Sequence, residues 1–208
     1  MRPLCEVCCP SLEAVKKAVT AGADRIELCE KLEVGGVTPS EELIRDSLSA
    51  AGPVPVNVLI RPREGGFVYN EKETSQMLAS VALCKELGVN GVVVGALRPD
   101  GSVDMDLMRR LVEAARPLSI TFHRAFDECS DVFIALEDIV SLGIDRILTS
   151  GHCATAYEGR FVLKELVARA AGRIVIMPGC GITPANLAEI AEVTGAAEFH
   201  GSKILFLI

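Results

Sequence analysis

Short apolar segments alternate with longer amphipathic segments along the chain, and one recurring pattern joins them. A helical stretch ends in glycine, one or two small or acidic residues follow, and a short apolar segment comes next. The pattern occurs at residues 21–29, 87–95, 142–151 and 194–202. It is typical of a helix that ends at a left-handed glycine and turns tightly into a buried strand.

The pattern predicts strands that alternate with helices from one end of the chain to the other. The expected strands cover residues 4–9, 24–29, 54–61, 90–95, 118–123, 145–149, 173–177 and 196–200. The expected helices cover residues 11–19, 38–48, 71–87, 104–115, 131–142, 158–170 and 183–194. Such alternation predicts right-handed βαβ units, a parallel sheet and the α/β class. Eight units favour a single TIM-like (β/α)8 barrel over residues 1–208. An open doubly wound sheet is disfavoured, since neither a glycine-rich dinucleotide motif nor a P-loop is present.

The end of the chain departs from this repeat. Only residues 204–208 follow the last strand and its short loop, whereas typical barrels need about 250 residues. We therefore expect the eighth helix to be missing or truncated. That would expose an apolar strip between the first and last strands, which predicts a homo-oligomer.

Composition narrows the class of protein. Half of the residues are hydrophobic and 24% are charged, which is enough for a large core. The net charge of −7 argues against nucleic acid or an anionic membrane as the main partner. Glu6 precedes any apolar stretch of leader length, so we expect a cytoplasmic protein. Its eight cysteines are then expected to be reduced, and their spacing matches no paired zinc pattern.

The side chains expected inside the barrel are unusually polar. Strand side chains alternate between the interior and the helix layer, which needs the apolar set. The set predicted to point inward is Glu6, Cys8, Arg25, Glu27, Cys29, Asn57, Leu59, Arg61, Thr121, His123, Glu198 and His200. Barrel interiors are ordinarily filled with branched aliphatic residues. Two interpretations stay open. Glu6, Arg25 and Glu27 form a buried ion network without a ligand, or the polar interior is a binding site.

Two of the inward cysteines are candidate metal ligands. Cys8 and Cys29 end adjacent strands, and neighbouring strands lie about 4.8 Å apart. Two thiolates at that separation can bind a soft cation such as Cu(I). The alternative is a pair of buried thiols that only pack, because free cysteine is commonly buried.

A second set of residues favours an organic anion. Gly179 and Gly181 follow the seventh strand, and Gly201 and Ser202 follow the eighth; barrels often bind phosphate at these loops. The alternative for the glycines is a tight turn. At the same rim, Arg61 is a candidate for holding negative charge, and His123 or Glu27 for transferring protons.

Several short motifs together resemble the CutC family, named for copper homeostasis. They include EVC at residues 6–8, GADRIELC at 22–29, IRPREGGF at 60–67, TFHRAFD at 121–127 and EFH at 198–200. The resemblance implies a TIM-like barrel that forms oligomers, with Cu(I) on Cys8 and Cys29. The chain departs from the family pattern at Cys180, where glycine is usual, and after His200, where the usual further helix is replaced by residues 201–208.

These observations lead to two functional hypotheses. The first is a cytoplasmic copper-homeostasis protein that binds Cu(I) through Cys8 and Cys29 at the barrel mouth. The alternative is a TIM-barrel enzyme that acts on a small anionic metabolite, phosphorylated metabolites included, with His123, Arg61 and Glu27 as catalytic candidates.

Overall fold

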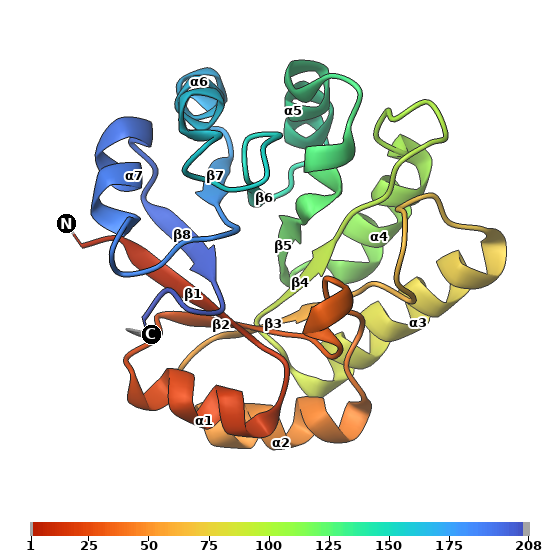
Figure 1. Ribbon diagram of the computed structural model, residues 1–208. Helices are drawn as coiled ribbons and strands as arrows, with labels where there is room; N and C mark the ends of the chain where they lie inside the picture. The colour runs from red at the N-terminus through yellow and green to blue at the C-terminus, as the bar shows by residue number, and fades with distance from the viewer. Residues whose placement is uncertain (1, 206–208) are drawn as a thin grey trace.

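The computed structural model describes residues 2–205, and they form a barrel of parallel strands inside a ring of helices (Figure 1). The strands are β1 (Leu4–Cys9), β2 (Arg25–Leu28), β3 (Val56–Leu59), β4 (Gly91–Val94), β5 (Ser119–Phe122), β6 (Arg146–Thr149), β7 (Val175–Pro178) and β8 (Glu198–Gly201). The helices are α1 (Leu12–Thr20), α2 (Glu41–Ala51), α3 (Glu71–Leu87), α4 (Met105–Ala115), α5 (Val132–Ser141), α6 (Arg160–Ala170) and α7 (Leu187–Thr194). Two 3-10 turns, η1 (Leu32–Val34) and η2 (Arg124–Glu128), lie in the loops after β2 and β5.

The strands follow one another around the barrel in chain order. The hydrogen-bonded order is β7-β6-β5-β4-β3-β2-β1-β8, and every pair is parallel. Because β1 pairs with both β2 and β8, the sheet curls back toward its own start (Figure 1). Among the described residues no ladder joins β7 to β8. The predicted TIM-like fold is therefore confirmed, as a nearly closed barrel.

Several helices begin and end at capping residues. Ser11 accepts a hydrogen bond from the Ala14 amide at the start of α1. Asn70 and Glu73 form a capping box at the start of α3, and Gly88 ends that helix with a φ of 73°. Capping oxygens satisfy amides that have no partner within the helix, and glycine adopts the left-handed conformation without steric cost. The local sequence therefore fixes the ends of these helices, and with them the lengths of the loops that connect helices to strands.

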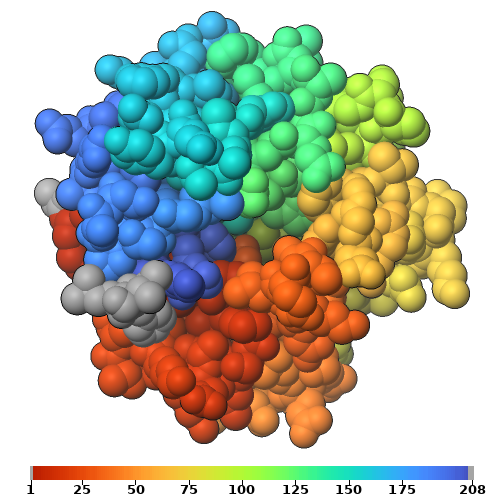
Figure 2. Space-filling model, viewed as in Figure 1, coloured from red at the N-terminus to blue at the C-terminus, as the bar shows by residue number. Residues whose placement is uncertain are grey.

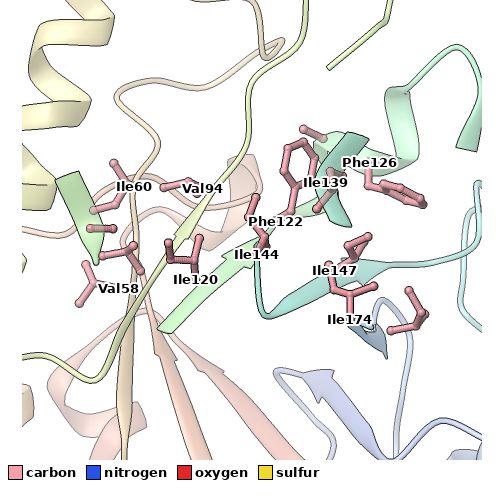
Figure 3. Packing of buried hydrophobic residues seen from close by; sticks show 14 of the residues in the cluster. Val58, Ile60, Val94, Ile120, Phe122, Phe126, Ile139, Ile144, Ile147 and Ile174 are labelled. Atoms are coloured by element: carbon pink, nitrogen blue, oxygen red, sulfur yellow. The ribbon is translucent and has the colours of Figure 1, made fainter. Parts of the chain in front are cut away.

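The main apolar core lies between the strands and the helices. Figure 3 shows Ile120 and Phe122 of β5 and Ile147 of β6 among the side chains of this layer. Cys5 and Cys9 of β1 belong to the same layer, as the alternation predicted. The apolar side chains of each strand point into this layer. The side chains that point into the barrel interior are therefore mostly the polar ones.

The end of the chain carries no eighth helix within the described residues. The ring of helices is interrupted between α7 and α1, next to both termini (Figure 1). The outward side chains of the neighbouring strands, Val7 and Phe199, are nevertheless buried, and Ile204 packs in the core. The apolar strip that argued for a homo-oligomer is therefore not exposed at these positions, and the oligomer stays a prediction.

Within residues 2–205, no helix is long and apolar enough to cross a membrane. The cytoplasmic location stays a prediction.

The core makes a direct prediction about stability. Phe122 is fully buried, whereas Phe161 of α6 is 65% exposed. We expect Phe122→Ala to lower the free energy of unfolding by about 3–5 kcal/mol, because it leaves a cavity between strand and helix. Phe161→Ala is the matched control and should change it by no more than about 0.5 kcal/mol. Urea denaturation followed by circular dichroism measures both, and equal losses would contradict this account of the core.

Candidate functional site

The carboxyl ends of the strands surround a cavity of about 590 Å³. The face seen in Figure 2 is hollowed near its centre, between the orange N-terminal segment and the blue C-terminal segment. Side chains predicted to point inward at this rim line the cavity, namely Cys8, Glu27, Arg61, His123 and His200. The structure therefore brings together residues from β1, β2 and β8 and from the loops after β3 and β5.

The two cysteines predicted as metal ligands are in contact. Cys8 Sγ lies 3.7 Å from Cys29 Sγ and 3.5 Å from Glu27 Oε1. The zinc–sulfur bond is about 2.3 Å long, so one ion of similar size can bridge two sulfurs at this separation. Cys8 lines the cavity, whereas Cys29 is fully buried and does not line it.

Two further ligand atoms lie beside Cys8. Ligand atoms of Cys8, Glu27 and His200 all fall within 4.8 Å of one another, and all three residues are buried. Sequence reasoning placed Glu27 among the catalytic candidates and left His200 without a role. The missing signal was the register of β8 on β1, which sets His200 opposite Glu6 and which only closure of the barrel determines.

The orientation of His200 suits a metal ligand. Its Nδ1 lies 2.8 Å from Glu6 Oε1, and its Nε2 lies 3.9 Å from Glu27 Oε1. A carboxylate that accepts the Nδ1 proton leaves Nε2 as the basic nitrogen. Metal-binding histidines are usually held in this way by a second carboxylate. Glu6 therefore orients the ring so that Nε2 faces Cys8 and Glu27. Burial acts to lower the pKa of His200, but the charge of Glu27 and the hydrogen bond to Glu6 outweigh it and raise the pKa, so a cation that binds here must also displace the Nε2 proton.

A buried ion network lies beneath this cluster. Arg25 bonds to Glu6 and, at 2.7 Å, to Glu198. Arg146 bonds to the same oxygen of Glu198 at 3.1 Å. Two guanidinium groups thus oppose two carboxylates, which makes the burial of these charges tolerable. The interpretation as a network without a ligand fits Glu6, Arg25 and Glu198.

Glu6 and Glu27 differ in their electrostatics. Burial acts to raise the pKa of Glu6, but the hydrogen bond from His200 and the charge of Arg25 outweigh it and lower the pKa to about 2. Burial raises the pKa of Glu27, although the charge of His200 opposes it. Glu27 Oε2 has no hydrogen-bond partner among the described residues. Glu27 therefore belongs to the cavity, and Glu6 to the network that supports it.

The thiol of Cys8 holds its proton firmly. The hydrogen bond with Cys29, burial and the charge of Glu27 raise its pKa well above the ordinary value. Thiolates, not thiols, bind metals. A cation that binds here must therefore displace protons, which makes its affinity depend on pH.

His123 is a neutral imidazole on another wall of the cavity. Its Nδ1 accepts a hydrogen bond from the Ala125 amide at 3.1 Å, so the ring proton is on Nε2. Burial and the charge of Arg61 lower its pKa from 6.5 to about 3. Nε2 is buried and has no partner among the described residues. At neutral pH this side chain is equipped to donate a hydrogen bond to a ligand rather than to exchange a proton with one.

Arg61 holds two loops together. Its Nη1 donates to Val34 O at 3.0 Å and to Gly36 O at 2.9 Å, and its Nη2 donates to Gly65 O at 2.6 Å. The guanidinium also lies over the Phe67 ring, 4.9 Å from its centroid. Its forked donors are therefore committed to backbone carbonyls, and it contributes charge to the cavity more than hydrogen bonds.

Only some of the residues predicted to bind an anion line the cavity. Gly181, Gly201 and Ser202 line the cavity, but Gly179 does not. The Gly179 amide donates to Thr149 O at 2.9 Å, and a Cβ at Gly179 would lie 2.4 Å from Leu148 Cδ1. Gly179 thus allows β7 to pack closely against β6. Anion binding at the other three positions stays a prediction.

The protonation state of His123 gives a testable prediction. Because its pKa is lowered in the folded state, protonation favours the unfolded chain as the pH falls below 6.5 toward about 3. The stability that neutral His123 provides is present above pH 6.5 and is lost over that range. In nitrogen-15 spectra of labelled histidine, the Nε2–H tautomer should persist well below pH 6.5. A titration of the His123 ring with a midpoint near 6.5 would contradict this.

Comparison with known proteins links the chain to one family. The sequence model of the CutC family matches residues 3–205. A CutC family protein of Parabacteroides distasonis is 50% identical over 202 residues, which cover 97% of this chain and 83% of that protein. The Homo sapiens protein named copper homeostasis protein cutC homolog is 47% identical over 199 residues, which cover 96% of this chain and 72% of the relative.

A solved structure extends the likeness to the fold. The crystal structure of the CutC protein from Streptococcus agalactiae matches with a TM-score of 0.93 at 35% identity. The match covers 97% of this chain and 99% of that one. The whole barrel is therefore shared.

Proposed function

Because the chain belongs to the CutC family, we propose that it is a copper-homeostasis protein that binds Cu(I) through Cys8 and Cys29. The names of the human and Streptococcus agalactiae relatives support the copper role. The observation that carries the proposal is the contact between the two sulfur atoms, 3.7 Å apart at the rim of the barrel.

The chemistry of the cluster favours a soft cation. Thiolate ligands select Cu(I) and other soft ions, whereas carboxylates and water suit Mg²⁺ and Ca²⁺. Cys8 is the residue that joins the two halves of the cluster, since it contacts both Cys29 and Glu27. Glu27 and His200 offer ligand atoms within 4.8 Å of that of Cys8, whereas Cys29 is not part of this group; Cys8 could therefore share an ion with either side. A reducing compartment such as the cytoplasm keeps such thiols available.

The alternative function, an enzyme that acts on a small anionic metabolite, has less support. Of its three catalytic candidates, Arg61 donates its forked groups to backbone carbonyls. Glu27 lies in the metal cluster beside Cys8, and His123 is held neutral by burial and by Arg61. Of these three candidates, neither Arg61 nor His123, the two outside the cluster, is therefore suited to act as a base in proton transfer.

Removal of either sulfur ligand tests the proposal. We expect the wild-type chain to bind Cu(I) stoichiometrically, and Cys8→Ser or Cys29→Ser to abolish that binding while the circular dichroism spectrum stays native. The loss follows because each variant removes one of two thiolates. Competition with a Cu(I) chelator measures the affinity.

Cys84→Ser provides the matched control, because Cys84 is equally buried but lies in α3 and not at the cavity. Wild-type affinity in Cys8→Ser and Cys29→Ser would refute the sulfur pair. A similar loss in Cys84→Ser would show that the effect comes from the fold.

The hydrogen bond between His200 and Glu6 gives a second test of the same site. Glu6→Gln removes the negative charge that accepts the His200 Nδ1 proton, so we expect Cu(I) affinity to fall by about tenfold to a hundredfold. Glu198→Gln is the control, because Glu198 bonds to Arg25 and Arg146 of the same network but not to His200. Equal affinities in the two variants would show that His200 is not a ligand, whereas the sulfur pair would still stand.

A further inference from the structure

The cavity is much larger than a metal ion requires. Its volume of about 590 Å³ falls in the range of sites for small organic molecules, about 300–1,000 Å³. The metal-ligand candidates lie on β1, β2 and β8, which are adjacent in the sheet. His123 follows β5, which β3 and β4 separate from β2. A copper ion at Cys8 and Cys29 would therefore leave the His123 side of the cavity without an occupant.

His123 presents a hydrogen-bond donor with no acceptor. The side chain is 4% exposed, it lines the cavity, and its Nε2–H has no partner among the described residues. The ring is fixed in place: its Nδ1 accepts from Ala125, the Phe67 ring lies 4.9 Å away, and a Cβ at Gly95 would lie 2.6 Å from it. A buried donor of this kind is costly unless a ligand supplies the acceptor.

The cavity lining carries charges of both signs, and the charged side chain that acts on His123 is the cation Arg61, which favours an anionic acceptor. The Arg61 guanidinium lies near enough to lower the pKa of the imidazole, and its buried Nε is also without a partner among the described residues. Lys203 lines the mouth of the same cavity. The nearby carboxylate of Asp127 is already engaged by Arg124, Thr149 Oγ1 and Ser150.

The number of donors favours a carboxylate over a phosphate. Phosphate presents three strong acceptor oxygens and is usually held by several backbone amides together with forked side chains. Here the forked groups of Arg61 and the amide of Gly179 are both used within the protein. Apolar side chains that include Leu59, Phe67 and Leu148 line the same cavity and suit the carbon part of a small organic acid.

We propose that the cavity binds a small organic carboxylate whose oxygen accepts the hydrogen bond of His123 Nε2, opposite the cysteine pair. This goes beyond copper binding and does not depend on it. The carboxylate has two possible sources, a free metabolite or an acidic thiol compound that carries Cu(I) into the cavity.

Nuclear magnetic resonance of the full chain with nitrogen-15 histidine tests the proposal directly. The probes are succinate, the complex of Cu(I) with glutathione, and inorganic phosphate. We expect succinate or the copper complex, at millimolar concentration or below, to shift the His123 Nε2–H resonance. A shift with succinate identifies a free carboxylate as sufficient, and a shift with the complex alone identifies the copper-bound source. No shift with either, or tighter binding of phosphate than of both, would overturn the proposal.

A matched pair of variants tests the role of the donor. His123→Asn keeps an oxygen that can accept from the Ala125 amide but is too short to reach the position of Nε2. We expect it to weaken binding of the effective probe by about tenfold to a hundredfold, as for a hydrogen bond to a charged group. His152→Asn is the control, because His152 lines the same cavity but its Nε2 is already bonded to Phe126 O at 2.7 Å. Equal affinities in the two variants would overturn the proposal.

The His123→Asn variant also tests whether carboxylate binding is independent of the metal site. Cu(I) supplied from a chelator buffer without carboxylate thiols should bind His123→Asn as it binds the wild type. Retained copper binding with lost probe binding supports two separate functions of the cavity. Loss of both in His123→Asn, with wild-type behaviour in His152→Asn, would show that His123 acts on the metal cluster and would overturn the assignment to a carboxylate.

Discussion

The carboxylate of Glu6 is the interaction on which the barrel interior depends. It accepts hydrogen bonds from Arg25 of β2, Asn57 of β3 and His200 of β8, while it stands on β1. One buried charge thus ties together four adjacent strands, including the last strand to the first. The same contacts fix the direction of the His200 ring. The pairing of β8 with β1 and the geometry of the candidate metal cluster therefore have a common physical cause.

The burial of charged side chains in the barrel interior is tolerated because these side chains are arranged in two layers. In the lower layer, Arg25 and Arg146 neutralise Glu6 and Glu198 through direct ion pairs, and such pairing is what permits burial. In the upper layer, Glu27 and His123 each keep a polar atom without a partner among the described residues. Unpaired polar atoms are costly and are retained mainly where a ligand uses them. The contrast distinguishes the paired charges that support the barrel from the unpaired polar atoms that the proposed ligands would use.

The alternation of side chains along each strand allowed most of the fold and part of the site to be predicted from the sequence. It assigned Cys5 and Cys9 to the helix layer and Cys8 to the interior, as observed. It could not show that Arg61 clamps two loops or that the Gly179 amide is used by β6, because loop conformations follow from tertiary contacts. Nor could it set the register of β8 on β1, which brings His200 to Cys8 and Glu27. Strand periodicity thus determines which way a side chain points, but closure of the barrel determines what it meets.

In the proposed copper site, the burial of Cys29 has a consequence for how a cation would reach the cysteine pair. Cys8, Glu27 and His200 line the cavity, whereas Cys29 is fully buried and does not line it. An entering ion therefore meets a mixed set of sulfur, oxygen and nitrogen donors before the second sulfur. Hard cations gain little from the last step, since it exchanges oxygen or nitrogen ligands for a thiolate. A soft cation gains from it and can displace the thiol proton. In the proposed copper site, the burial of Cys29 away from the cavity would therefore favour soft ions.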